Sequence, residues 1–203
     1  MANPEKQSTA PILGGLIRKR RKQMGLTLQQ LCDKATLSVG YLSQVERDNA
    51  TPTLGTLAQI AAALEVSLEY FVATPKPSDA VTRAENRPRF SVPGSDTTYE
   101  AIGAEFPGAE LSSYLLHVPP GFSSETVSHE GEEIIFVIEG EIEQVLDGQT
   151  FRLRAGDSLH YSGKTPHSWS NPTETTTRIL WTGTLSVLKG SASIDLPELT
   201  VVT

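Results

Sequence analysis

The residues between 127 and 140, which read VSHEGEEIIFVIEG, are the part of the chain best equipped for chemistry. They include His129 and Glu133, an imidazole and a carboxylate of the kinds that bind divalent metals in proteins. Side chains two apart on a β-strand point to the same side, so such residues can share one pocket. The stretch raises the question of whether the chain uses a metal or keeps a polar pocket without one.

Other catalytic motifs are missing from the sequence. It has no Gly-x-Ser-x-Gly turn, which presents a nucleophilic serine, and no glycine-rich loop of the kind that holds phosphates. Its one cysteine, Cys32, lies among apolar positions of an expected helix and cannot form an intrachain disulfide, which fits a reducing compartment. We therefore predict that the protein is not an enzyme.

The chain has no run of eighteen apolar residues, and its start, MANPEKQSTAPILGG, lacks the apolar stretch of a secretory signal. These features predict a cytoplasmic protein. Its charge is uneven: residues 1–75 carry eight basic and six acidic side chains, whereas residues 76–203 carry nine and eighteen. Five of the early cations form the run Arg18–Lys22, which can attract a polyanion such as DNA.

Two different periodicities divide the chain. In residues 11–73, apolar residues recur at three- and four-residue spacing, Thr27 and Ser38 stand where N-caps are expected, and Pro52-Thr53 should open a further helix, so this part should be helical. Residues 74–90 are rich in proline and charge and are expected to be a linker. From 91 to 203, short alternating segments with Gly and Pro between them predict an all-β sandwich or barrel.

Two further expectations concern the ends and faces of these parts. Residues 1–10 are predicted to be disordered. In the segment EEIIFVI, residues 132–138, apolar side chains occupy both alternating sets of positions. This strand should therefore be covered on both faces, one of them by a second protomer.

The helical part closely resembles the XRE-type family of helix-turn-helix proteins, which includes phage repressors and Cro. The features that carry the resemblance are the short turn Thr36–Ser38, the SQVER ending of the third helix, the Pro-Thr-Leu start of the fourth and the final SLEYF. The resemblance implies a five-helix, lambda-repressor-like domain that binds double-stranded DNA as a homodimer. Its third helix would enter the major groove.

Residue by residue, the resemblance implies two kinds of DNA contact. The positions expected to contact or adjoin bases are Val39, Gly40, Tyr41, Ser43 and Gln44. An amide such as that of Gln44 can pair with the edge of adenine, and Val39 could pack on a thymine methyl. The positions expected to contact phosphates are Arg18, Arg21, Arg47 and Asn49. Val39 and Gly40 offer no polar side chain, so DNA shape would supply part of the specificity.

The β part resembles the cupin family of small jelly-roll barrels. Residues 121–140 and 156–171 match its two motifs, with His129, Glu133 and His167 at metal-ligand positions. The first histidine of the motif is replaced by Val127, and Ser162 and Lys164 stand where proline and glycine are usual. These departures leave the fold assignment intact and weaken the metal assignment.

The resemblance leaves two uses of the barrel open. His129, Glu133 and His167 could hold Zn, Fe, Mn or Ni with open coordination positions. Without a metal they would line a pocket for a small polar molecule, and an excess of carboxylates there would favour a cation such as an amine. The residues expected to line this pocket are Glu125, Val127, His129, Glu133, Tyr161 and His167.

Together these features predict a sequence-specific transcriptional regulator, most simply a repressor, whose DNA affinity responds to a small molecule in the barrel. One alternative is a metal-dependent cupin enzyme tethered to a DNA-binding module. Another is a DNA-binding protein whose barrel only dimerises.

Overall fold

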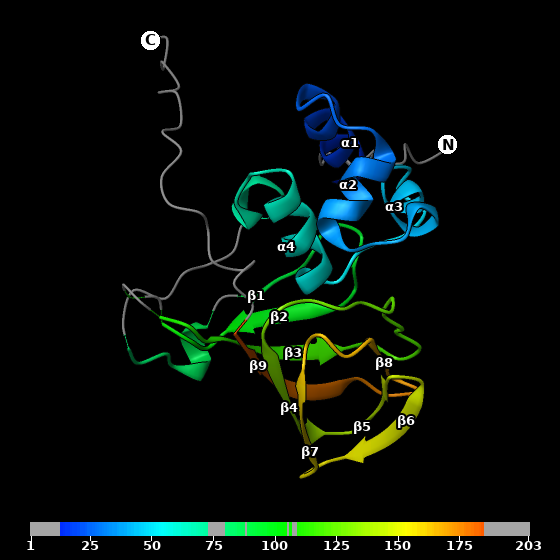
Figure 1. Cartoon of the computed structure of the whole chain (residues 1–203). Helices are drawn as coiled ribbons and strands as arrows, with labels where there is room; N and C mark the ends of the chain where they lie inside the picture. The colour runs from blue at the N-terminus through cyan, green and yellow to red at the C-terminus, as the bar shows by residue number, and fades with distance from the viewer. Residues whose placement is uncertain (1–12, 73–79, 88, 105, 107–108, 185–203) are drawn as a thin grey trace, which may run out of the picture.

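The computed structural model describes residues 13–72, 80–87, 89–104, 106 and 109–184. An all-helical domain at the N-terminal end lies against a β-barrel, and helix α4 is the helix next to the barrel (Figure 1). The segment predicted to be disordered, residues 1–10, lies outside the described residues, as do the last nineteen residues of the predicted cupin range.

The helical domain contains four α-helices and one short 3₁₀-helix. They are α1 (Leu13–Gln23), α2 (Leu28–Ala35), α3 (Val39–Val45), α4 (Leu54–Ala63) and η1 (Leu68–Tyr70). The predicted count of five helices is therefore not confirmed, since the fifth segment among the described residues is a single 3₁₀ turn. Only three residues lie between Ser67 and Phe71, too few to continue a ladder of i to i−4 hydrogen bonds.

Side-chain caps begin three of the helices at the predicted residues. Thr27 and Gln30 form a reciprocal capping box at α2. The hydroxyl of Ser38 accepts a hydrogen bond from the Tyr41 backbone N–H at α3, and Thr53 does the same for Thr56 at α4. Each cap satisfies a backbone donor that the first turn of a helix leaves free.

The barrel is formed by two antiparallel sheets. The larger has the order β1-β2-β3-β9-β4-β7 and the smaller β6-β5-β8. The strands are β1 (Arg89–Phe90), β2 (Thr98–Ala101), β3 (Ser112–Val118), β4 (Glu132–Glu139), β5 (Glu141–Leu146), β6 (Gln149–Arg154), β7 (Ser158–Ser162), β8 (His167–Ser170) and β9 (Thr177–Gly183). Two facing sheets of this kind enclose a core between them.

Strand β4 shows how alternation divides inside from outside. Glu133, Ile135 and Val137 are buried inside the barrel. The alternate residues point outward, and three of them are large apolar side chains left partly exposed: Ile134 (43 %), Phe136 (39 %) and Ile138 (40 %). The apolar side chains at both alternating sets of positions in β4 therefore form one buried face and one face that this single chain does not fully cover.

The described part of the expected linker has structure of its own. It contains the 3₁₀ turn η2 (Ala84–Asn86), and β1 begins at Arg89. The ring of Phe90 stacks on Tyr99 of β2 with centroids 5.5 Å apart, so the end of this segment is part of the larger sheet.

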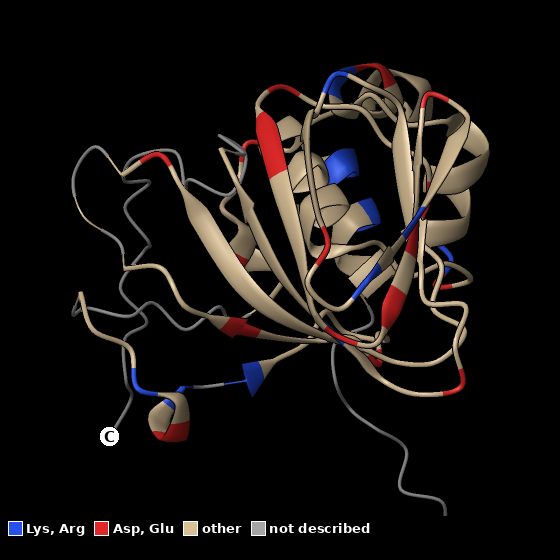
Figure 2. Ribbon diagram, turned by 90° about the horizontal axis from the view of Figure 1, so that it is seen from below, with Lys and Arg blue, Asp and Glu red and all other residues tan. Residues whose placement is uncertain are grey.

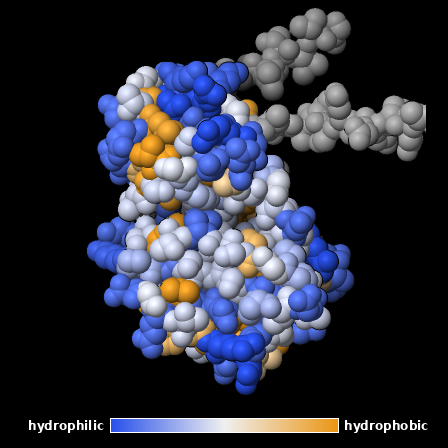
Figure 3. Space-filling model, turned by 90° about the vertical axis from the view of Figure 1, so that its right-hand side faces the viewer, coloured by the Kyte–Doolittle hydropathy of each residue, from blue (hydrophilic) through white to orange (hydrophobic). Residues whose placement is uncertain are grey.

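The charged residues are distributed differently in the two domains. Asp and Glu residues are spread over barrel strands and loops, whereas the basic residues of the helical domain gather on its helices (Figure 2). Hydrophilic side chains cover most of the face seen in Figure 3, with apolar patches on both lobes. Among the described residues no helix is long and apolar enough to span a bilayer.

Candidate functional site

Helix α3 is fixed against α1 by two contacts that sequence reasoning missed. A Cβ atom on Gly14 would lie 2.2 Å from the carbonyl oxygen of Val45, so only glycine allows this close approach. The Arg21 guanidinium forms a two-pronged ion pair with Glu46 at the end of α3, with Nη2 and Oε2 2.8 Å apart. Both side chains are largely buried, at 12 % and 7 % exposed. These contacts set the orientation of α3.

The predicted base-contacting residues occupy different faces of α3. Val39, Gly40 and Gln44 are exposed. The Asn49 side-chain amide donates to Oε1 of Gln44 at 3.1 Å, which orients the Gln44 amide with its NH₂ group free to donate. Ser43 is half-buried, and Arg47 donates to its hydroxyl at 3.0 Å.

Tyr41 has a different environment from its neighbours. It lies two residues after Val39, about 200° around the helix, and therefore points away from the exposed face. Its hydroxyl is buried, and burial together with the nearby Glu125 carboxylate of the barrel raises the pKa of this phenol. In this arrangement Tyr41 does not fit the predicted role beside the bases.

The residues predicted to contact phosphates also differ in their exposure. Arg18, Arg47 and Asn49 are exposed and available to a DNA backbone. Arg21 is not, because its guanidinium bonds Glu46 and also donates to the carbonyl of Leu26 at 2.9 Å. Arg21 therefore holds α3 in place. The sequence of the run Arg18–Lys22 does not show that Arg21 and Arg18 differ in this way.

A cavity of about 60 Å³ is lined by residues of both sheets and of the helical domain. Five of the six predicted pocket residues line it: Glu125, Val127, His129, Glu133 and His167. Tyr161 stands just behind, and its hydroxyl donates a hydrogen bond to Glu133. Sequence reasoning missed three other sets of lining residues, which are the aromatic pair Tyr99 and Tyr114, the tryptophans Trp169 and Trp181, and Thr53 to Thr56 of α4.

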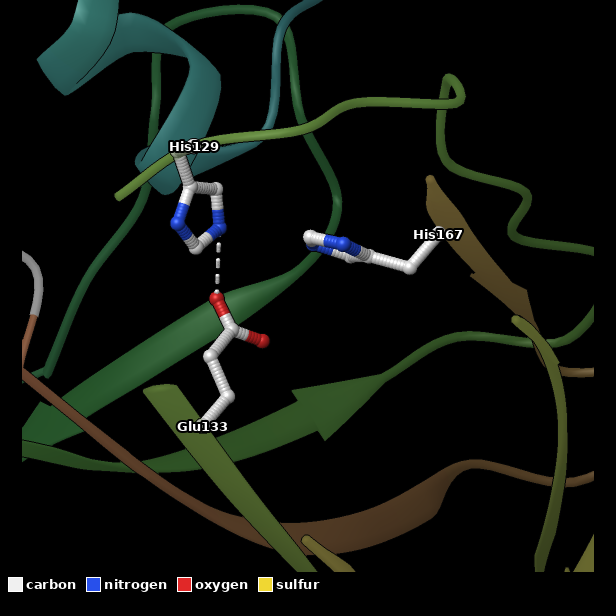
Figure 4. A group of neighbouring side chains, drawn as sticks. All are labelled: His129, Glu133 and His167. Atoms are coloured by element: carbon white, nitrogen blue, oxygen red, sulfur yellow. Dashed lines mark ion pairs between the residues drawn. The ribbon is translucent and has the colours of Figure 1, made fainter. Parts of the chain in front are cut away.

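The two histidines and the glutamate converge inside this cavity (Figure 4). His129 Nε2 lies 2.9 Å from Oε1 of Glu133, and the two imidazole rings meet edge to face with centroids 5.0 Å apart. His129 has room because residue 163 is glycine: a Cβ there would lie 2.4 Å from its Nδ1. Val127 pairs with His167 in a short antiparallel bridge, so the replaced ligand position is beside the site.

The protonation of these groups follows from their contacts. Burial alone would lower the pKa of His129, but the hydrogen bond to Glu133, the charge of that carboxylate and a hydrogen bond to the Glu130 backbone together raise it. Burial would raise the pKa of Glu133, whereas hydrogen bonds from His129 and Tyr161 lower it. Burial lowers the pKa of His167. These directions favour an ion pair between His129 and Glu133 and the neutral form of His167.

The donor set fits a divalent cation. One ligand atom from each of His129, Glu133 and His167 lies within 4.8 Å of the others, and two histidines with one carboxylate form a known three-ligand set. The Nδ1 atom of His167 lies 2.8 Å from the Thr165 carbonyl, which leaves Nε2 as the coordinating atom. The other two histidines face elsewhere, since His117 pairs with Glu100 and His160 with Glu132.

Comparisons with known proteins agree with this architecture. Residues 17–71 match the family described as Helix-turn-helix, and residues 114–183 match the family described as Cupin domain. The HTH-type transcriptional regulator PuuR of Escherichia coli is 29% identical over 162 residues, covering 79% of this chain and 88% of its own. SutR of the same organism, also an HTH-type transcriptional regulator, is 26% identical over 84% of this chain and 93% of its own.

A solved structure shares the two-domain fold. The HTH_3 family transcriptional regulator from Vibrio cholerae superposes with a TM-score of 0.54 at 21% identity, over 85% of this chain and 94% of its own. Family matches, relatives and fold together support the same two-part assignment. The chain is an XRE-type helix-turn-helix transcriptional regulator with a C-terminal cupin domain.

Proposed function

We propose that this regulator changes its affinity for DNA when a small molecule binds in the cupin cavity. The observation that carries the proposal is that residues 53–56 of the DNA-binding domain form part of the cavity wall. A molecule that binds there contacts both domains. Such a ligand alters DNA binding only if it binds the free and DNA-bound proteins with different affinity, typically by about 1–3 kcal/mol.

The DNA-reading part of the proposal rests on the exposed face of α3. Val39, Gly40 and Gln44 would meet base edges, while Arg18, Arg47 and Asn49 would contact phosphates. The basic first helix supplies attraction, and the acidic barrel stays away from DNA. We propose repression as the outcome, because a bound operator blocks polymerase without further contacts, and the cytoplasm as the location.

We further propose a homodimer that uses the outer face of β4. Ile134, Phe136 and Ile138 form an apolar stripe, bordered by the pairs His160–Glu132 and Arg178–Glu139. A two-fold axis requires a self-complementary surface, and an apolar centre with acid–base pairs beside it meets that requirement. Two copies would place their α3 helices on half-sites about 34 Å apart.

The role of a metal in this proposal is limited. His129, Glu133 and His167 would hold the cation, and a bound Zn, Fe, Mn or Ni ion would supply a Lewis acid at that end of the cavity. With Val127 in place of a fourth ligand, we propose that the barrel senses rather than catalyses. Metal analysis of the purified protein, with and without chelator, tests this part.

Gln44→Ala should relax base selection at one operator position. An amide pairing with a base edge accounts for about 1–3 kcal/mol of discrimination against the wrong base. Selection from a random DNA pool would measure the change, with Gln149→Ala, an exposed glutamine of β6, as the control. An unchanged selected sequence would refute this role for Gln44.

His167→Ala should reduce the response to an effector by about tenfold or more, because it removes a buried polar group from the cavity. The measurement is the shift in operator affinity as effector is titrated. Thr150→Ala is the control, since Thr150 is exposed on β6, outside both the cavity and the proposed dimer face. A parallel loss of effector-free DNA binding would indicate a folding defect, and an unaltered response would exclude His167 from the sensing site.

A further inference from the structure

Glu125 of the barrel lies where the two domains meet. The backbone N–H and the hydroxyl of Thr53 both approach its Oε1 atom, at 3.3 and 3.4 Å. Thr53 is the N-cap of α4, a ten-residue helix, and its hydroxyl also accepts from the Thr56 backbone N–H at 3.2 Å. A carboxylate in this position is stabilised by the positive end of the helix dipole. Both contacts are at the long end of the hydrogen-bond range, so another donor can replace them.

The same carboxylate is close to the DNA-reading helix. The Tyr41 hydroxyl of α3 is buried beside Glu125 and makes no geometrically satisfactory hydrogen bond to a described residue. Tyr99 of β2 connects the same region to the backbone of Leu54. One barrel side chain therefore touches the start of α4 and the inner side of α3.

Glu125 also faces the cavity. The other carboxylate there, Glu133, already accepts hydrogen bonds from His129 and Tyr161. No lysine or arginine lines the cavity among the residues that the structure describes, and the His129 imidazole there is paired with Glu133 and not with Glu125. Four aromatic side chains complete the walls: Tyr99, Tyr114, Trp169 and Trp181. A carboxylate surrounded by aromatic rings favours a cation.

We infer that the cavity binds a small organic ammonium ion and that this ligand competes with Thr53 for Glu125. The inference rests on the proposed function and names its ligand class and its coupling group. An ammonium group is a stronger partner for a carboxylate than a long hydrogen bond from a hydroxyl. When the ligand takes Glu125, the start of α4 loses its barrel contact, and α3 loses the contact beside Tyr41. Because binding is reciprocal, a change on the Thr53 side that weakens this contact and leaves Glu125 in place must strengthen ligand binding.

The size of the cavity agrees with a small ligand. A volume of about 60 Å³ has room for roughly four ordered water molecules, or a few non-hydrogen atoms. The wall formed by residues 53–56 limits this space, and its displacement would enlarge the site. The ligand and the docked position of α4 thus compete for space as well as for Glu125.

The first arm of the test uses the full chain and three probes of matched size: propylammonium, propanol and propionate. The chain has two tryptophans, Trp169 and Trp181, and both line the cavity, so intrinsic fluorescence reports its occupancy. We expect propylammonium to bind more tightly than the other two. Glu125→Gln should weaken it about tenfold, because a charge-assisted hydrogen bond is lost. Failure of all three probes to bind, or equal affinity of the three, would overturn the cation assignment.

The second arm tests whether propylammonium competes with Thr53 for Glu125. Thr53→Ala removes the hydroxyl and loosens the start of α4, so propylammonium should bind about fivefold more tightly. Thr27→Ala is the matched control, because it removes an equivalent cap from α2 and leaves the Thr53 and Glu125 residues in place. If the Thr53→Ala and Thr27→Ala variants bind propylammonium with equal affinity, the ligand does not compete with Thr53 for Glu125.

Operator affinity measured with and without propylammonium separates this inference from the proposed function. A ligand that binds through Glu125 but leaves DNA affinity unchanged would support the cation site and contradict the proposed function. A ligand-dependent DNA affinity, with no difference between the two threonine variants, would support the function and reject Glu125 as the shared acceptor.

Discussion

Arg21→Ala should destabilise the helical domain by about 3–5 kcal/mol, the usual cost of removing one partner of a buried ion pair. The reason is that Glu46 would stay buried at the end of α3 with no positive partner. Since α3 carries the expected base contacts, specific DNA binding should be lost at temperatures where the variant domain unfolds. Urea unfolding and operator binding of the same preparation would measure both effects.

Two further variants distinguish the effect of breaking the ion pair from the effect of removing one positive charge from α1. Arg18→Ala removes an exposed cation from the same helix, so it should weaken DNA binding modestly and leave stability nearly unchanged. Arg21→Met combined with Glu46→Leu replaces the pair with apolar side chains and should recover most of the stability. A destabilisation of Arg21→Ala below about 1 kcal/mol would contradict the positioning role.

Phe136→Glu should dissociate the dimer and lower apparent operator affinity by about 10²–10⁴-fold. The substitution places a charge in the middle of the apolar stripe on β4, where a second copy would have to bury it without a partner. A monomer engages one half-site at a time and loses the gain that comes from linking two binding events.

Phe136 is already 39 % exposed, so the fold of the single chain should tolerate glutamate. Sedimentation would report the oligomeric state, and titration of a palindromic operator would report affinity. Thr150→Glu, at an exposed position of β6 in the smaller sheet, is the control for adding a charge. A Phe136→Glu protein that remains dimeric would exclude this face as the interface.

Local patterns predicted the local structure well. The caps at Thr27, Ser38 and Thr53 are side-chain to backbone contacts over three residues, so the sequence alone reveals them. Periodicity separated a helical part from a β part, because a buried face repeats every 3.6 residues in a helix and every two in a strand. The three groups His129, Glu133 and His167 do converge, as the motif spacing indicated.

Contacts between segments that lie far apart along the chain could not be predicted from the sequence. Thr53 meets Glu125 across 72 positions, and Arg21 meets Glu46 across 25. Nothing in a basic run shows which arginine turns inward, so Arg21 was grouped with Arg18. The resemblance groups Tyr41 with the expected base contacts because it adjoins them in sequence, and only the docking of the barrel shows that its hydroxyl lies near Glu125.

The most direct test of the account is to map where the protein binds across its own genome. The account predicts discrete, roughly palindromic sites whose half-sites lie about 34 Å apart, and a shift in their occupancy when the effector is present. Discrete sites beside an operon would also nominate ligands for the barrel. The absence of discrete sites under every growth condition would contradict the account, because α3 would then not be acting as a sequence reader.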